Sequence, residues 1–132
     1  MTILVAYVPR PEGQAALDKG LEIAARRKER LLVVNAGPGG AGSQDDRKLA
    51  DTLDVERVET LLAASGLDAE FKQFVRGRNA VAEIEALVDE LDVSLVIIGL
   101  RKRSPVSKLI LGSVAQQILL NVSCPVLAVK AY

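Results

Sequence analysis

The chain has 132 residues, a length that suits one compact domain and leaves little room for a second. Hydrophobic residues make up 49% of it, which excludes an intrinsically disordered chain. The 17 basic and 17 acidic side chains cancel, so no overall charge favours nucleic acid or an anionic membrane surface. The chain contains no histidine, which excludes Ser/His triads and every metal site built on histidine.

Cysteine usage and the first residues favour a cytoplasmic protein. Cys124 is the only cysteine, so neither an internal disulfide nor a multi-cysteine zinc site can form, and we expect Cys124 to fill space in the core. Residues 1–4 lack the basic start of a signal peptide, and no apolar run approaches the about 20 residues of a membrane-spanning helix. We therefore expect residence in the cytoplasm and no membrane partner.

Five short runs have the pattern of strands in a parallel sheet. Continuous Val, Ile and Leu are typical of strands that are covered on both faces. One of the runs instead alternates apolar and polar residues, as an edge strand does. The expected strands are residues 3–8, 31–35, 69–75, 93–98 and 126–129.

Four helical patterns separate these strands, over residues 15–27, 45–64, 79–91 and 113–121. The inward stripe expected for the second helix is Leu49, Leu53, Val58, Leu61 and Leu62. Gly66 then supplies a left-handed stop. Strict alternation of strands and helices predicts an α/β fold, with one doubly wound domain over residues 1–132 and helices on both faces of a parallel sheet.

The loop after the fourth strand has the features of an anion site. In open α/β sheets, ligands bind beyond the carboxyl ends of the strands. Gly99 permits a close backbone approach there, and Gly112 and Ser113 open the last helix, whose free N–H groups favour an anion. The loop also carries four cations, Arg101, Lys102, Arg103 and Lys108. A solvated basic loop before a well-capped helix is the alternative interpretation.

Known catalytic and phosphate-binding patterns are missing. The chain has neither G-x-G-x-x-G after the first strand nor a G-x-x-x-x-G-K-[ST] loop. Without histidine, an activated cysteine or carboxylates clustered at a strand end, no catalytic acid, base or nucleophile can be named. We therefore expect a binding or interaction protein rather than an enzyme.

In its order of elements and in several local motifs, the chain resembles the universal stress protein family. The resemblance covers essentially the whole chain and rests on Val-Ile-Ile-Gly at 96–99, Leu-Gly-Ser at 111–113 and Cys-Pro-Val-Leu-Ala-Val at 124–129. It implies a five-stranded parallel sheet in the order 3-2-1-4-5, a cytoplasmic dimer and a role in the stress response. Many members of the family bind ATP through the motif G-x-x-G-x9-G-[ST].

The chain keeps the spacing of that motif but not all of its residues. Gly99 matches the first glycine, and Gly112 and Ser113 match the last pair. Lys102 stands at the second glycine position, where its side chain either blocks a phosphate or neutralises its charge. Val8 stands where ATP-binding members commonly carry an aspartate after the first strand.

The resemblance also implies where a nucleotide would bind. Adenine would lie between Val8 and Val34. The phosphates of ATP, with Mg²⁺ if it is bound, would lie against Gly99, Lys102, Gly112, Ser113 and the N–H groups of Val114 and Ala115. Slow ATP hydrolysis, which is described for the family in general, has no assignable residue here.

The last strand bears on assembly. The resemblance implies that residues 126–132 pair with the same strand of a second copy. This pairing would give a homodimer and cover an exposed strand edge. Two interpretations of function follow. The chain is a dimeric nucleotide-binding stress protein with a degenerate site, or it is a dimeric interaction module of the same family that binds no nucleotide.

Overall fold

The computed structural model describes residues 1–35, 45–73, 80–102, 109–110 and 113–131. Within a few described elements, the side chains of residues 45–52, 80, 102, 109–110 and 113 are not described. Among the described residues, none of the helices combines the length and the apolar character that crossing a membrane requires.

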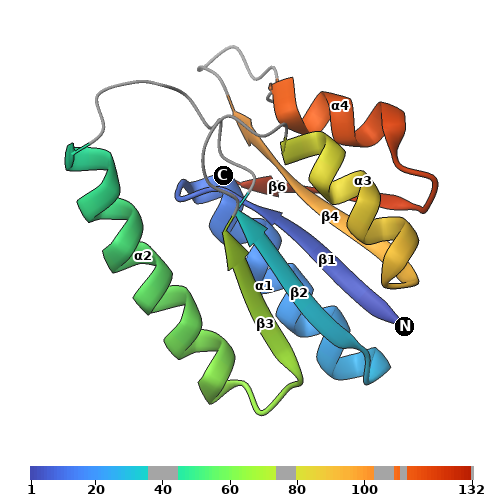
Figure 1. Cartoon of the computed structure of the whole chain (residues 1–132), viewed down its shortest axis with the longest axis horizontal. Coiled ribbons are helices and arrows are strands. Elements are labelled where there is room, and N and C mark those ends of the chain that lie inside the picture. Colours follow the sequence, from blue (N-terminus) through green and yellow to red (C-terminus); the bar gives the residue numbers. More distant parts are fainter. Residues whose placement is uncertain (36–44, 74–79, 103–108, 111–112, 132) are drawn as a thin grey trace.

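A parallel sheet forms the centre of the molecule, and its strand order is the predicted one (Figure 1). Its five parallel strands are β1 (Thr2–Tyr7), β2 (Arg30–Asn35), β3 (Ala69–Gln73), β4 (Val93–Lys102) and β6 (Val126–Ala131). They lie in the order β3-β2-β1-β4-β6, which corresponds to 3-2-1-4-5 when only parallel strands are counted. A two-residue strand, β5 (Leu109–Ile110), pairs antiparallel with the end of β4 and was not predicted.

Two helices cover each face of the sheet. They are α1 (Pro11–Arg27), α2 (Asp45–Ala64), α3 (Ala80–Glu90) and α4 (Ser113–Asn121). Helices α1 and α2 lie on one side of the sheet and α3 and α4 on the other (Figure 1). Alternate residues of the strands face the two sides, and each side has its own apolar core. Cys124 packs against the core under α3 and α4, and burial raises the pKa of its thiol.

Two element boundaries differ from the predictions by more than two residues. Helix α1 begins at Pro11 rather than at residue 15, because proline suits the first helical position, where no N–H is needed. Strand β4 continues to Lys102 rather than ending at 98, because β6 and β5 give its last residues backbone partners. The predicted third strand is confirmed as far as Gln73, and its last two predicted residues lie outside the described part.

The predicted inward stripe of α2 was partly wrong. Val58 and Leu62 are buried, as expected. Leu53 is 61% exposed and Leu61 is 37% exposed, so both face solvent. The side chain of Leu49 lies outside the described part. The five positions do not fit on one face of this helix, because residues three or four apart share a face and Leu53 and Val58 are five apart.

Helix α1 lies unusually close to the sheet because glycines line the contact. A Cβ atom on Gly20 would lie 2.5 Å from Cγ2 of Val5, and one on Gly13 would lie 1.7 Å from the carbonyl oxygen of Val8. On the strand side, a Cβ atom on Gly99 would lie 2.1 Å from the carbonyl oxygen of Glu12. The start of α1 therefore touches the backbone of both β4 and the turn after β1.

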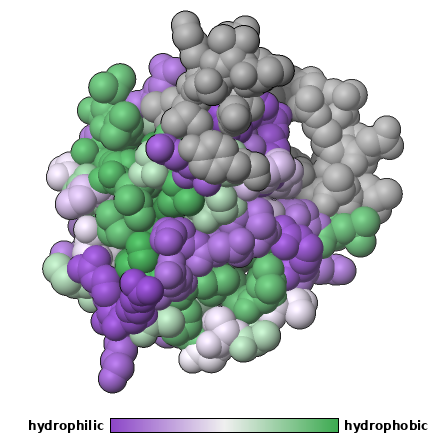
Figure 2. Space-filling view, turned by 180° about the vertical axis from the view of Figure 1, so that it is seen from behind, coloured by the Kyte–Doolittle hydropathy of each residue, from purple (hydrophilic) through white to green (hydrophobic). Residues whose placement is uncertain are grey.

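Strand β6 is an edge strand beside exposed apolar residues. Leu119 and Leu120 of α4 and Leu127 of β6 are exposed by 48%, 80% and 36%. Hydrophobic surface gathers on the left of Figure 2, the side on which α4 and β6 lie in that view. Val126 and Val129 are half-buried against opposite cores, which fixes the strand on the sheet.

The close approach of α1 predicts a specific coupling between Gly20 and Val5. Gly20→Ala should lower the free energy of unfolding by about 1–3 kcal/mol, because the added methyl group overlaps Cγ2 of Val5. In a Val5→Ala background, which lacks that methyl group, the same substitution should cost much less. Chemical denaturation of the four proteins of this double-mutant cycle measures the coupling, and equal costs in both backgrounds would contradict the contact.

Candidate functional site

The carboxyl edge of the sheet brings β1, β4 and the start of α4 together. Arg101 pairs with Ala131 of β6 and also with Ile110 of β5. A strand has only two edges, so β5 lies on the edge of β4 that faces β1, beyond the point where β1 ends. Helix α4 begins at Ser113, and three residues span at most about 11 Å. The amino-terminal end of α4 is therefore held near the ends of β1 and β4.

Gly99 makes the close approach that was predicted, and its partner is the protein itself. On the α1 face, the space where its Cβ atom would stand is filled by the backbone of Glu12. Its neighbour in β6 is Val129. A glycine is needed at this position for the packing of α1, whether or not a ligand binds.

The turn after β1 is compact and built from backbone contacts. Val8 is half-buried, and its carbonyl oxygen accepts a hydrogen bond from the N–H of Arg10 at 2.8 Å. Arg10 is the N-cap residue of α1 and makes no side-chain capping hydrogen bond. Position 8, where an aspartate was the family's expected residue, is a valine. The nearest acidic residue of this turn, Glu12, has its backbone packed on Gly99.

The other predicted adenine residue lies inside the core. Val34 is fully buried under α3 and α4, and it pairs with Ala6 in the sheet. Val114 and Ala115, in the first turn of α4, are half-buried against the same core. The structure thus places Val34, Val114 and Ala115 on one face of the sheet, with Val8 at its edge.

Of the predicted phosphate residues, two are described in their backbone alone and one is not described. Lys102 closes β4 and pairs with Leu109 of β5, but its side chain is not described. Ser113 is the first residue of α4, and its side chain is likewise not described. Gly112 lies outside the described residues.

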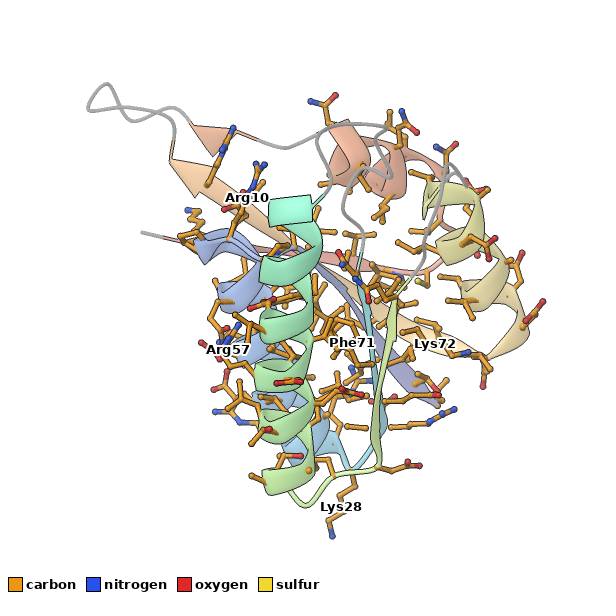
Figure 3. All side chains as sticks on the ribbon, turned by 60° about the vertical axis from the view of Figure 1, so that its left-hand side comes forward. Arg10, Lys28, Arg57, Phe71 and Lys72 are labelled. Atoms are coloured by element: carbon orange, nitrogen blue, oxygen red, sulfur yellow. The ribbon has the colours of Figure 1, made fainter. Side chains whose placement is uncertain are left out.

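Positive charge is present at this edge. Arg10 and Arg101 are exposed, and neither forms an ion pair with a carboxylate of the described residues. Arg10 lies at the end of α1 nearest the carboxyl ends of the strands, opposite Lys28 (Figure 3). Exposed guanidinium groups near a helix amino terminus favour an anionic ligand.

Next to this edge lies a polar cluster that the sequence did not reveal. Tyr7, the last residue of β1, is 1% exposed. Its hydroxyl donates to Oδ2 of Asp54 at 2.5 Å and accepts from Nη2 of Arg57 at 2.8 Å. Arg57 also contacts Oδ1 of Asp54 through Nε at 3.2 Å and Nη2 at 3.0 Å. We call Tyr7, Asp54 and Arg57 the Tyr7 triad.

Aromatic packing holds the Tyr7 ring from the other side. The ring of Phe71 on β3 meets it edge to face, with centroids 6.1 Å apart. Burial, and then the hydrogen bond and charge of Asp54, raise the pKa of Tyr7 well above its usual range. A tyrosine inside an apolar strand was the available signal for this cluster, since a buried hydroxyl needs a partner.

The chain is similar to known proteins over nearly its whole length. A model of the universal stress protein family matches residues 1–130. A universal stress protein from Mycolicibacterium smegmatis is 45% identical over 130 residues, 98% of each chain. Among solved structures, the universal stress protein from Archaeoglobus fulgidus superposes with a TM-score of 0.76 at 29% identity, over 98% of this chain and 97% of that one. A universal stress protein structure from the same organism, in complex with dAMP, has a TM-score of 0.70 at 22% identity, with 98% and 96% coverage.

The raised pKa of Tyr7 predicts a pH dependence of stability. In the unfolded chain the phenol loses its proton near pH 10, whereas in the folded protein it keeps the proton to higher pH. The stabilisation is complete below pH 10 and is lost as the pH rises through the folded pKa. Above pH 10 the unfolding free energy should fall with pH by up to about 1.4 kcal/mol per unit more steeply than in Tyr7→Phe.

Denaturation of both proteins between pH 7 and pH 11 provides the comparison. At pH 7, Tyr7→Phe should be less stable by about 1–2 kcal/mol, because a hydrogen bond to a carboxylate is lost. The lysines and Tyr132 are common to both proteins, so their titration cancels. Parallel curves above pH 10 would show that Tyr7 is not buried with its proton.

Proposed function

The chain belongs to the universal stress protein family, and we propose that it is a cytoplasmic, dimeric member that binds a nucleotide weakly at the carboxyl edge of its sheet. It would act by binding, since the chain has no histidine and no assignable catalytic group. The observation that carries the proposal is the β4–β5 hairpin, which brings the start of α4 to the ends of β1 and β4.

This arrangement offers donors for phosphate groups. The first N–H groups of α4 have no partners within the helix, and its dipole favours negative charge at that end. Arg101 is exposed and pairs through its backbone with Ile110, three residues before α4 begins. The relative from Archaeoglobus fulgidus that was solved in complex with dAMP has the same fold, which supports a nucleotide as the ligand.

The same geometry favours weak binding. Val34 is fully buried in the core, so of the two residues expected to enclose the base only Val8 is partly exposed at this edge. Gly99 is covered on one face by Glu12, so phosphate groups would have to approach from the other face or from the strand end. The described residues hold no group of three potential metal ligands, so Mg²⁺ would enter with the phosphates of ATP.

Lys102 would replace the missing glycine as a charge contact. It lies in a β ladder opposite Leu109, and the described non-glycine residues with positive φ are Lys28 and Asp92. Position 102 therefore does not need the backbone freedom of glycine. An ammonium group at this position would neutralise phosphate charge, and its effect would grow with the number of phosphates.

Calorimetric titration with AMP and with ATP and Mg²⁺ tests this role. Lys102→Gly should weaken ATP binding by about fivefold, the effect of one exposed charge contact, and AMP binding by less. Lys28→Gly is a matched control, because it removes the same charge at the far end of α1, where φ is 55° and glycine fits (Figure 3).

Each outcome of the titration has a definite meaning. Tighter ATP binding by Lys102→Gly would show that the lysine blocks the site. If neither the native chain nor Lys102→Gly shows heat up to millimolar ATP or AMP, the nucleotide proposal is wrong. The chain would then be the interaction module of the family.

The proposed dimer would form through the free edge of β6. The N–H of Val96 donates to the carbonyl of Pro125 at 3.0 Å, and the pairing of β4 with β6 is parallel. In such a ladder the backbone groups of alternate residues point to opposite edges. The N–H and C=O groups of residues 126, 128 and 130 therefore point away from β4, free to pair with a second copy beside Leu127.

Ala128→Pro should prevent this pairing without breaking the sheet. Proline removes only the outward N–H at position 128, and an edge strand tolerates that loss. Sedimentation velocity should show a dimer for the native chain and for Ala128→Thr, the control, which keeps the N–H. Ala128→Pro should sediment as a folded monomer, and a native chain that sediments as a monomer at 100 µM would contradict the proposed dimer.

A further inference from the structure

The described side chains of α2 include few that are buried against the sheet. Of its described side chains, residues 53–64, only Val58 and Leu62 are buried, while Leu53 and Leu61 face solvent. Its main packing partner is β3, the other edge strand of the sheet. Buried apolar area is the main source of helix docking, so residues 53–64 of α2 rest on the sheet through a small apolar contact.

The Tyr7 triad supplies a polar attachment for the same helix. Asp54 and Arg57 lie one turn apart on α2, and both reach the Tyr7 hydroxyl at the end of β1. The hydroxyl uses both its donor and its acceptor capacity, and both oxygens of Asp54 are bonded. Arg57 projects from α2, and the ring of Phe71 lies between α2 and β3 (Figure 3). The triad thus connects α2 to β1, the central strand of the sheet, although the main packing partner of α2 is the edge strand β3.

The carboxyl end of α2 has the features of a hinge. The helix ends at Ala64, and Gly66 follows with φ of 75° and nothing within 4 Å of the position of its missing Cβ atom. The hydroxyl of Ser65 donates a hydrogen bond to the carbonyl oxygen of Leu62 at 2.6 Å, which closes the last turn of the helix. Small residues in open space at the end of an element can absorb a change of backbone angle.

We propose that α2 is a strap which the Tyr7 triad latches to the carboxyl end of β1, and which opens about Gly66 as a unit while the rest of the fold stays intact. Opening would uncover Tyr7, Phe71 and the apolar face made by Val58 and Leu62. Closing returns Asp54 and Arg57 to the Tyr7 hydroxyl. The latch is independent of nucleotide binding, so the two proposals are tested by separate experiments.

Hydrogen exchange followed by mass spectrometry tests the latch. In Tyr7→Phe, peptides from α2 should exchange about tenfold faster than in the native chain, because opening no longer breaks the bonds to the hydroxyl. Over labelling times too short for exchange through global unfolding, peptides from α1, α3 and β1 should take up deuterium as in the native chain, because the lower overall stability of Tyr7→Phe does not act on that timescale. Asp54→Asn is the second variant, since it keeps the Tyr7 ring packed on Phe71 while it removes the charge that binds Arg57.

The control breaks ion pairs of a helix that needs no latch. Glu22 of α1 pairs with Lys19 at 2.6 Å and with Arg26 at 3.2 Å on the exposed side of α1. Glu22→Gln should leave exchange in α2 unchanged. Faster exchange confined to α2 in either triad variant supports the strap. Equal acceleration in all helices, or no acceleration in α2, would overturn it, and if Tyr7→Phe does not fold, Asp54→Asn decides alone.

Discussion

The architecture depends on the direct backbone contact between α1 and the centre of the sheet. Gly13 and Gly20 on the helix and Gly99 on β4 leave no room for a single extra carbon at their contacts. This contact fixes the turn after β1, the start of α1 at Pro11 and the end of β4 relative to one another. The carboxyl edge of the sheet, where the candidate site lies, is therefore held in place by packing within the protein and does not need a ligand to form.

The fold could be predicted from the sequence because its signals are local and repeated. Unbroken runs of Val, Ile and Leu mark the buried strands, and four helical patterns mark the crossovers. The strand order was implied by the family resemblance, and the structure confirms it. The length of β4 and the existence of β5 could not be predicted, because residues 99–102 become a strand only through partners in β5 and β6. The inward orientation predicted for Leu53 and Leu61 was wrong for the same reason, since tertiary contacts decide which face of α2 meets the sheet.

The candidate site was only partly predictable, for a different reason. The spacing of Gly99, Gly112 and Ser113 indicates a place in the fold, and the structure holds the ends of β4 and α4 together there. Spacing does not distinguish a glycine that meets phosphate from one that meets Glu12. The Tyr7 triad joins residues 47 and 50 positions apart, and no pattern within one element shows such a pairing. The side of the sheet under α2 thus has its own polar chemistry, opposite the core that holds Val34.

The most direct test of the central contact is the stability of ligand-free Gly99→Ala, measured by chemical denaturation and followed by titration with AMP. The added Cβ atom would lie 2.1 Å from a backbone oxygen of α1, which cannot move as a flexible side chain does. We predict that the free energy of unfolding falls by about 2–3 kcal/mol with no nucleotide present. Unchanged stability together with the loss of AMP binding would contradict this result, and would mean that Gly99 serves the ligand and not the fold.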